Sequence, residues 1–156
     1  MRPGDTAPDF QLPDQTGTPR KLSELLADGP VVLFFYPAAM TYGCTKESCH
    51  FRDLAAEFAA VGAQRVGISA DAVEKQKRFD EKESLGFPLL SDPDRLVAAQ
   101  LGAKRSLGLL PNRRVTFVID ADRTILDVIH TEVSMGAHAD RALAVLRERG
   151  AAAGSG

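Results

Sequence analysis

The sequence has no excess of basic charge and no long apolar run. Its 156 residues include 19 Lys and Arg against 21 Asp and Glu, which gives a net charge of −2, whereas proteins that bind nucleic acids usually carry a basic patch or stripe. No apolar run approaches the roughly 18 residues of a membrane span. The opening MRPGDTAPDFQLP lacks the basic-then-apolar order of a secretory signal. We therefore expect a cytoplasmic protein with no nucleic-acid partner and no membrane partner.

Cysteine is also scarce, with two residues in the chain. In a reducing compartment, two cysteines are more often catalytic or metal-binding than a structural disulfide. Apolar residues make up 44% and charged residues 26% of the sequence, as in globular proteins. The length suits one domain, which we assign to residues 1–150. The small residues of 151–156 are expected to form a disordered tail.

Strand-like and helix-like patterns alternate along the chain. The apolar run VVLFFY at 31–36 predicts a strand buried on both faces. Apolar residues at helical spacing follow it over 44–61 and stop before Gly62. Further strands are predicted at 65–70, 87–92, 114–120 and 124–130, and further helices at 22–27, 71–83, 94–101 and 138–149. Asp71 is a candidate N-cap, and residues 105–112 are predicted as a loop. This order predicts a layered α/β domain with a mostly parallel sheet and one late antiparallel hairpin.

Both cysteines lie in PAAMTYGCTKESC, residues 37–49, directly after the buried strand. Cys44 lies where the loop turns into the helix, and it follows Thr41, a candidate capping hydroxyl, and the flexible Gly43. The unpaired N–H groups of a first helical turn, together with the positive end of the helix dipole, favour the thiolate form of a cysteine there. The sequence therefore predicts that Cys44 is a reactive thiol.

Cys49 follows Cys44 by five residues. On an intact helix the two Cα atoms would lie about 8.7 Å apart, whereas a disulfide needs less than about 7 Å. The thiols can therefore bond only if the first turns unwind, which suits a disulfide that forms and breaks. The alternative for Cys49 is an inert buried side chain. A metal site from Cys44, Cys49 and His50 is disfavoured, because the spacing is not that of a zinc module.

The segment PAAMTYGC fits the Pro-x-x-x-Thr-x-x-Cys signature of peroxiredoxins through Pro37, Thr41 and Cys44. The longer run FFYPAAMTYGCTKESCHFRD, with its second cysteine, resembles the bacterioferritin comigratory protein subgroup, also called peroxiredoxin Q. The likeness covers roughly residues 3–148. It implies a thioredoxin-like fold, with a central mixed β-sheet flanked by helices and a turn-rich N-terminal β extension. It also implies a thiol peroxidase for hydrogen peroxide and organic hydroperoxides that needs no cofactor.

The resemblance further implies a role for each thiol. Cys44 would be the peroxidatic cysteine, which becomes a sulfenic acid, and Cys49 the resolving cysteine, which forms an intramolecular disulfide with it. Thioredoxin or a similar dithiol reductant would reopen the bond. The family's arginine matches Arg114, two residues before Thr116. The alternative for such an arginine is a solvated charge at the strand end, which we prefer for Arg113, because successive strand side chains point to opposite faces.

Two other positions carry weaker signals. Glu47 matches a glutamate that often orients the family's arginine, and its alternative is an acid in the first helical turn that the dipole favours. The subgroup usually has proline where this chain has Tyr42, so we expect a less restricted helix start and a phenol near the pocket. We expect a monomer, with a weak dimer as the alternative.

Two rival functions remain to be compared with this one. A thiol–disulfide oxidoreductase that acts on proteins usually carries Cys-x-x-Cys, which this chain lacks. A binding or chaperone-like module would have kept the fold and lost catalysis. The joint presence of Pro37, Thr41, Cys44 and Arg114 disfavours that second rival.

Overall fold

The computed structural model describes residues 1–103, 113–130 and 135–154. Within these residues the strands are β1 (Gln11–Pro13), β2 (Pro19–Lys21), β3 (Val31–Phe35), β4 (Gln64–Ser69), β5 (Leu89–Ser91), β6 (Val115–Ile119) and β7 (Ile125–His130). The helices are α1 (Leu22–Leu26), α2 (Tyr42–Asp53), α3 (Ala55–Ala60), α4 (Val73–Glu83), α5 (Leu96–Leu101) and α6 (Met135–Gly154). Each predicted strand in these ranges is present, and so is each predicted helix except that of 44–61, although some boundaries differ.

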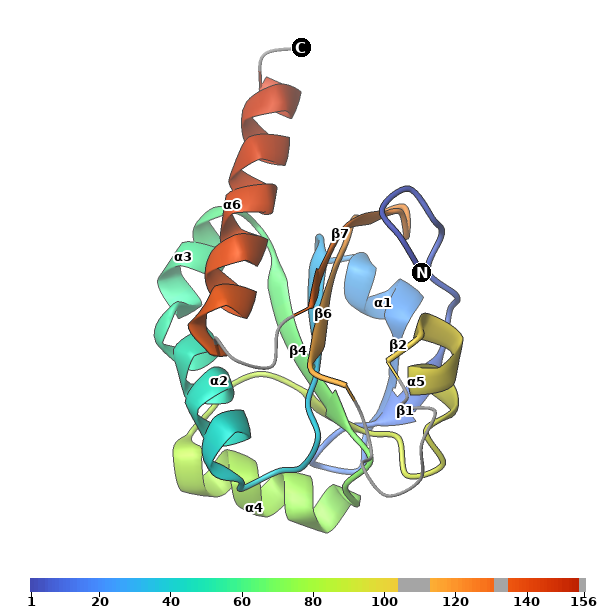
Figure 1. Cartoon of the computed structure of the whole chain (residues 1–156), viewed down its shortest axis with the longest axis vertical. Helices are drawn as coiled ribbons and strands as arrows, with labels where there is room; N and C mark the ends of the chain where they lie inside the picture. Colours follow the sequence, from blue (N-terminus) through green and yellow to red (C-terminus); the bar gives the residue numbers. More distant parts are fainter. Residues whose placement is uncertain (104–112, 131–134, 155–156) are drawn as a thin grey trace.

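A five-stranded mixed sheet, in the order β5-β4-β3-β6-β7, forms the centre of the described part of the chain (Figure 1). The pairs β3–β4 and β4–β5 are parallel, whereas β3–β6 and β6–β7 are antiparallel. The mixed sheet is thus confirmed, but the sheet is not mostly parallel, because β6 returns beside β3 in the opposite direction. The short β1 and β2 pair with each other as the N-terminal β extension.

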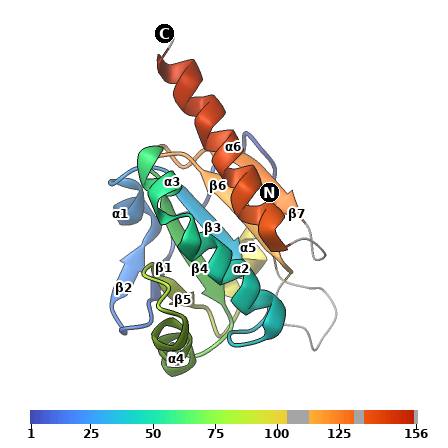
Figure 2. The ribbon, with the colours of Figure 1, turned by 90° about the vertical axis from the view of Figure 1, so that its left-hand side faces the viewer.

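Helices cover both faces of this sheet. In Figure 1, α1 and α5 lie on one side of it and α2, α3 and α6 on the other, and Figure 2 shows these last three helices in front of the sheet. All five residues of β3 are buried. Alternate side chains of β3 join separate cores: Leu33 and Phe35 pack with α1 and α5, whereas Val32 and Phe34 pack with α2 and α6. This central strand leads into the segment with both cysteines.

The helix predicted over 44–61 is wrong as a single element, because α2 and α3 meet at a break. Leu54 sits between them with φ −96° and ψ 21°. The guanidinium of Arg65, on β4, donates to the backbone carbonyls of Phe51 and Arg52 at 3.0 and 3.5 Å. These bonds satisfy the last carbonyls of α2, so that the helix can end there without leaving them unpaired.

The C-terminal helix is longer than predicted. It runs from Met135 to Gly154, so the expected disordered tail at 151–156 is wrong for its first four residues. Three successive alanines, which have the highest helix propensity, extend the helix. The predicted loop at 105–112 lies outside the described residues, and the single-domain assignment stays a prediction. Among the described residues, no helix is long and apolar enough to cross a membrane.

Candidate active site

Cys44 is the third residue of α2, and its side chain is 1% exposed. The first intrahelical bond runs from the amide of Thr45 to the carbonyl of Thr41 at 2.9 Å. The amides of residues 42–44 therefore precede the hydrogen-bonded part of the helix and stay available as donors beside the thiol. Thr41 is the N-cap residue, as expected, but its hydroxyl does not cap the helix. It donates to the carbonyl of Ala38 at 2.8 Å instead.

Arg114 contacts the thiol of Cys44 directly. It precedes β6, whose Val115 pairs with Phe35 at the end of β3, and this register brings the arginine to the start of the loop that leads to Cys44. Its Nη2 donates to Sγ of Cys44 at 3.3 Å. Arg114 is 8% exposed, whereas its neighbour Arg113 is exposed. Strand alternation thus separates the two arginines in the way that the sequence suggested.

Glu47 lies one turn beyond Cys44 on the same face of α2 and is fully buried. Its Oε1 accepts from Nη1 of Arg114 at 3.2 Å. It lies outside the first turn of α2, so the alternative of a dipole-favoured acid does not hold. Burial raises the pKa of Glu47 to about 8, although the charge of Arg114 acts in the opposite direction. One guanidinium therefore bridges the thiol of Cys44 and the buried carboxyl group of Glu47.

His138 also belongs to this site, although it was not predicted as a site residue. His138, on α6, is fully buried, and its Nδ1 lies 2.7 Å from Oγ1 of Thr116 on β6. Its Nε2 lies 3.5 Å from Oε2 of Glu47. A signal existed in the sequence, because His138 shares a helical stripe with the buried Ala142 and Leu146. A histidine within an apolar stripe needs a polar partner inside the protein.

Asp71 supports the loop that carries the signature residues. The expectation that it caps α4 is wrong, since the N-cap is Ala72 and has no side-chain bond. The Oδ2 atom of Asp71 accepts instead from the amide of Ala39 at 2.7 Å and from the hydroxyl of Ser69 at 2.6 Å. Pro37 lies partly buried in the same loop. The loop before α2 is thus tied to the end of β4.

Cys49 lies in different surroundings. Its side chain is partly buried, and its thiol donates to Oε2 of Glu83, the last residue of α4, at 3.4 Å. Burial raises the pKa of the Cys49 thiol, and the hydrogen bond to Glu83 adds to the effect. Arg52 also joins the two helices, since its Nη1 donates to the carbonyl of Glu83 at 2.6 Å. Both cysteines are free thiols, so the structure represents the reduced protein.

Two of the three residues considered as metal ligands in the disfavoured alternative, His50 and Cys49, have other partners. His50 pairs with Asp140 at 2.9 Å, while Cys49 faces Glu83. Within the described ranges, no group of three or more His, Cys, Asp and Glu residues is arranged to hold a metal. Tyr42, two residues before Cys44, is 84% exposed, so its side chain lies in solvent.

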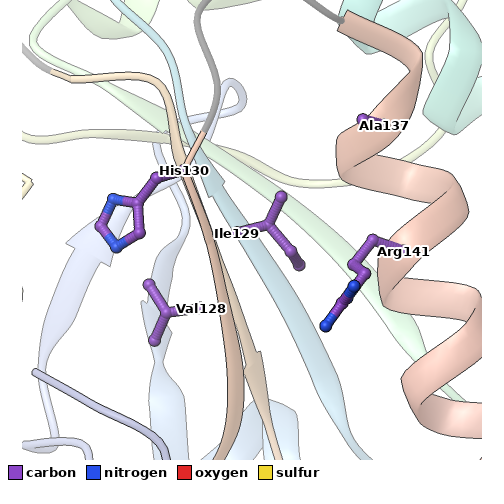
Figure 3. A pocket seen from close by; sticks show the side chains of 5 residues that line it. All are labelled: Val128, Ile129, His130, Ala137 and Arg141. Atoms are coloured by element: carbon purple, nitrogen blue, oxygen red, sulfur yellow. The ribbon is translucent and has the colours of Figure 1, made fainter.

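A pocket of about 320 Å³ lies between β7 and α6 (Figure 3). It is lined by residues 128–130 of β7 together with Ala137 and Arg141 of α6. None of its lining residues is a predicted site residue. The site itself is therefore the set of contacts around Cys44.

Comparisons with known proteins agree with this geometry. Residues 3–128 match the AhpC/TSA family. A putative peroxiredoxin of Mycobacterium tuberculosis is 67% identical over 149 residues, which cover 94% of this chain and 97% of that protein. The crystal structure of peroxidoxin BcpB from Mycobacterium tuberculosis has a TM-score of 0.92 at 67% identity and covers 95% of this chain and 97% of that one.

A more distant structure shares the same fold. The bacterioferritin comigratory protein of Xanthomonas campestris, studied for its alkyl peroxide reduction, has a TM-score of 0.83 at 28% identity, with 96% of each chain covered. These likenesses, with a buried thiol beside an arginine at the start of a helix, identify the activity. The chain belongs to the AhpC/TSA family, and it is a peroxiredoxin, a thiol peroxidase.

Proposed function

We propose that Cys44 is the peroxidatic cysteine. The observation that carries this proposal is the contact of 3.3 Å between its Sγ and Nη2 of Arg114. A peroxide is reduced when a thiolate attacks one oxygen and the other leaves as hydroxide or alkoxide. The guanidinium of Arg114 favours the thiolate and supplies fixed donors for the peroxide oxygens. The free amides at the start of α2 add donors that are in place before the reaction.

Thr41 and Pro37 complete the proposed peroxide site. The Thr41 hydroxyl donates to the carbonyl of Ala38, which leaves its oxygen able to accept the O–H of a peroxide. Pro37 has no N–H group, so it shields the thiolate without competing for it. Glu47 holds the arginine through the bond at 3.2 Å, and we propose a supporting role for it.

We propose that Cys49 is the resolving cysteine. Its thiol condenses with the sulfenic acid of Cys44, forming the S–S bond and releasing water, so the thiol hydrogen and the sulfenic hydroxyl leave together. Because α2 is intact over both residues, the first turns must unwind before the sulfurs can meet. Cys49 must also leave Glu83, its partner in the reduced protein.

This cycle leads to proposals for the substrates, the reductant, the compartment and the oligomeric state. We propose that the substrates are hydrogen peroxide and organic hydroperoxides, supported by the alkyl peroxide reduction of the Xanthomonas relative. Peroxiredoxins act on peroxides with thioredoxin-type reductants, and we propose thioredoxin or a similar dithiol protein here. A reducing compartment such as the cytoplasm suits two cysteines that must return to free thiols. We also propose a monomer, since the cycle needs no residue from a second copy.

The test combines peroxide with single-thiol variants. The wild-type protein should lose two free thiols after one equivalent of hydrogen peroxide. Cys49→Ser should still react and should retain a sulfenic acid at Cys44, detected by mass analysis, but thioredoxin-linked turnover should stop. An inert binding module would lose no thiols.

Hydrogen exchange tests the unwinding. Amides of residues 44–54 should exchange faster in the disulfide form than in the reduced form, while β3 stays protected in both. Equal protection of 44–54 in both forms would rule out the resolving role of Cys49.

A further inference from the structure

The loop between β3 and α2 is held at two points by the same part of the structure. The hydroxyl of Tyr36, directly after β3, donates to Oε1 of Gln76 on α4. Three residues later, the amide of Ala39 donates to Oδ2 of Asp71, which lies between β4 and α4, at 2.7 Å. Pro37, a residue of the peroxide site, lies between these two points. The loop is therefore fixed on both sides of Pro37.

The two partners of the loop are joined to each other inside the protein. The amide of Gln76 donates to Oγ of Ser69 at 3.0 Å, and the hydroxyl of Ser69 donates to Oδ2 of Asp71 at 2.6 Å. Tyr36, Ser69 and Gln76 are fully buried, and the side chain of Asp71 is 10% exposed. We call these four residues the loop clamp. A buried network with satisfied hydrogen bonds is rigid, so the loop clamp holds the loop in one position.

The loop clamp supports a turn that the backbone itself does not favour. Met40, next to Ala39, has φ 64°, a left-handed conformation that residues other than glycine seldom adopt and that persists only where the surroundings impose it. On one side of Met40, the amide of Ala39 is bound to Asp71. On the other side, the hydroxyl of Thr41 donates to the carbonyl of Ala38 at 2.8 Å. The bond to Asp71 thus helps to impose the turn from which Thr41 and α2 begin.

The contacts of Asp71 indicate a role in position rather than in charge. Its Oδ2 is occupied by the amide of Ala39 and the hydroxyl of Ser69. Its Oδ1 pairs with Nζ of Lys75 at 3.1 Å, so a neighbouring cation offsets its negative charge. What Asp71 gives the site is therefore a fixed backbone position.

We propose that Asp71 is a positioning residue for the reaction of Cys44 with peroxide. Through the amide of Ala39 it fixes the turn at Met40, and this turn directs the hydroxyl of Thr41 and the first amides of α2 towards the peroxide. These groups align the two peroxide oxygens for attack by the thiolate. Alignment of this kind supplies a large part of a rate enhancement, so a loop that moves should slow the reaction while the thiol stays intact.

The inference rests on the proposed role of Cys44, and it can be tested in a Cys49→Ser background, where Cys44 is the one thiol of the sequence. The first readout is the rate of sulfenic acid formation with hydrogen peroxide. The second is the rate of alkylation by iodoacetamide, with the midpoint of its pH profile. Both reactions use the thiolate, but only the peroxide reaction needs donors aligned on two oxygens. A merely loosened site would be alkylated faster, and a changed thiolate fraction would shift the alkylation midpoint.

The main variant is Asp71→Ala. We expect the peroxide rate to fall by about ten- to a hundredfold, while the alkylation rate stays within about twofold and the alkylation midpoint within about half a pH unit. Asp71→Asn should keep the peroxide rate within about threefold of the background, because one amide oxygen can accept from both Ala39 and Ser69. Asp94→Ala, at an exposed aspartate after β5, is the matched control and should change none of these measurements.

Two results with Asp71→Ala would overturn the proposal. One is an unchanged peroxide rate in the folded variant. The other is an alkylation rate that rises several-fold, because Asp71 would then only keep the site closed. A background protein that forms no sulfenic acid would overturn the proposed function itself, whereas these two results overturn the role of Asp71 alone.

A second pair of variants gives an answer even if Asp71→Ala does not fold. Asp71→Asn keeps the length of the side chain and removes its charge, whereas Asp71→Glu keeps the charge and moves the carboxylate by one methylene group. If position is what matters, Asp71→Glu should lower the peroxide rate by about fivefold or more, and Asp71→Asn by less than about threefold. The opposite order would assign the effect to charge and overturn the proposal.

Discussion

The two cysteines lie on one helix, yet opposite charges face them. Cys44 accepts from the guanidinium of Arg114 at 3.3 Å, whereas Cys49 donates to the carboxylate of Glu83 at 3.4 Å. The difference comes from the elements that pack against α2. The segment before β6 places the guanidinium of Arg114 beside Cys44, whereas α4 places the carboxylate of Glu83 beside Cys49. A guanidinium favours a thiolate, and a carboxylate favours a thiol. The tertiary environment thus assigns two chemical states to two neighbouring cysteines.

This division suits a reaction with two steps. The first step needs a thiolate, and the site of Cys44 favours one. The second thiol should stay protonated until a sulfenic acid exists, and burial together with Glu83 raises the pKa of Cys49 accordingly. The contact with Glu83 also holds Cys49 against α4. In the reduced protein, α2 is therefore kept helical at the position of Cys49. The comparison therefore predicts that changes near each thiol affect different steps.

Cys44→Ser should have the largest effect. A serine hydroxyl is not ionised near neutral pH, so turnover with hydrogen peroxide and a dithiol reductant should fall to the background rate. Cys49→Ser is the matched control for the first reaction alone, because it should still form a sulfenic acid at Cys44 with one equivalent of peroxide, whereas Cys44→Ser should form none. Turnover above background in Cys44→Ser would mean that the two cysteines do not differ as proposed.

Arg114→Ala should have the next largest effect. Loss of a charge-assisted hydrogen bond, which is typically about 1.5–3 kcal/mol, should slow the attack on peroxide by roughly ten- to a hundredfold. The alkylation midpoint of Cys44 should move to higher pH in the same protein. Arg113→Ala removes an exposed arginine beside it and should leave both measurements near those of the wild type. If the two variants had equal effects, Arg114 would not be the residue that activates Cys44.

The sequence predicted the first cysteine environment better than the second. The buried strand before Cys44 and the helix that starts beside it follow from local patterns, because strand period and helix termini are local properties. Arg114 was indicated by the resemblance to peroxiredoxins, and strand alternation separated it from Arg113. Glu83 and His138 were missed, since each reaches the site from an element far away in sequence. Their positions depend on how α4 and α6 pack on the sheet. The break at Leu54 was missed for the same reason, because its partner Arg65 comes from β4.

Glu83→Gln should have a smaller effect, confined to the second thiol. Because burial is the larger cause of the raised pKa of Cys49, removal of the Glu83 charge should lower that pKa only in part. In a Cys44→Ser background, alkylation of Cys49 at neutral pH should become several-fold faster. Glu81→Gln changes an exposed glutamate on the same helix and serves as the control. A slower alkylation of Cys49 would show that Glu83 does not hold it as a thiol.

Tyr42→Pro should have the smallest effect, on the opening of α2 at the Cys44 end. Position 42 is the first residue of α2, where proline is well tolerated because the amide precedes the helical hydrogen bonds. The residue before a proline must be extended, and Thr41 already has φ −85° and ψ 159°. Tyr42 is 84% exposed, so the loss of its side chain removes little packing.

Proline at this position should raise the free energy of unfolding by about 0.4–1 kcal/mol, since it restricts the unfolded chain at no conformational cost to the folded one. Stabilisation of the first turn should also slow the disulfide step. The initial reaction of Cys44 with peroxide should change little, because Arg114 and the amides of residues 43 and 44 remain as donors when proline removes the amide of residue 42. Urea unfolding of the reduced protein and rapid-mixing measurements of the two steps would check this. Tyr42→Ala is the control, because it removes the ring without restricting the backbone. If the two variants form the disulfide at the same rate, the start of α2 does not limit the unwinding, and the contact between Cys49 and Glu83 becomes the place to look for the limiting step.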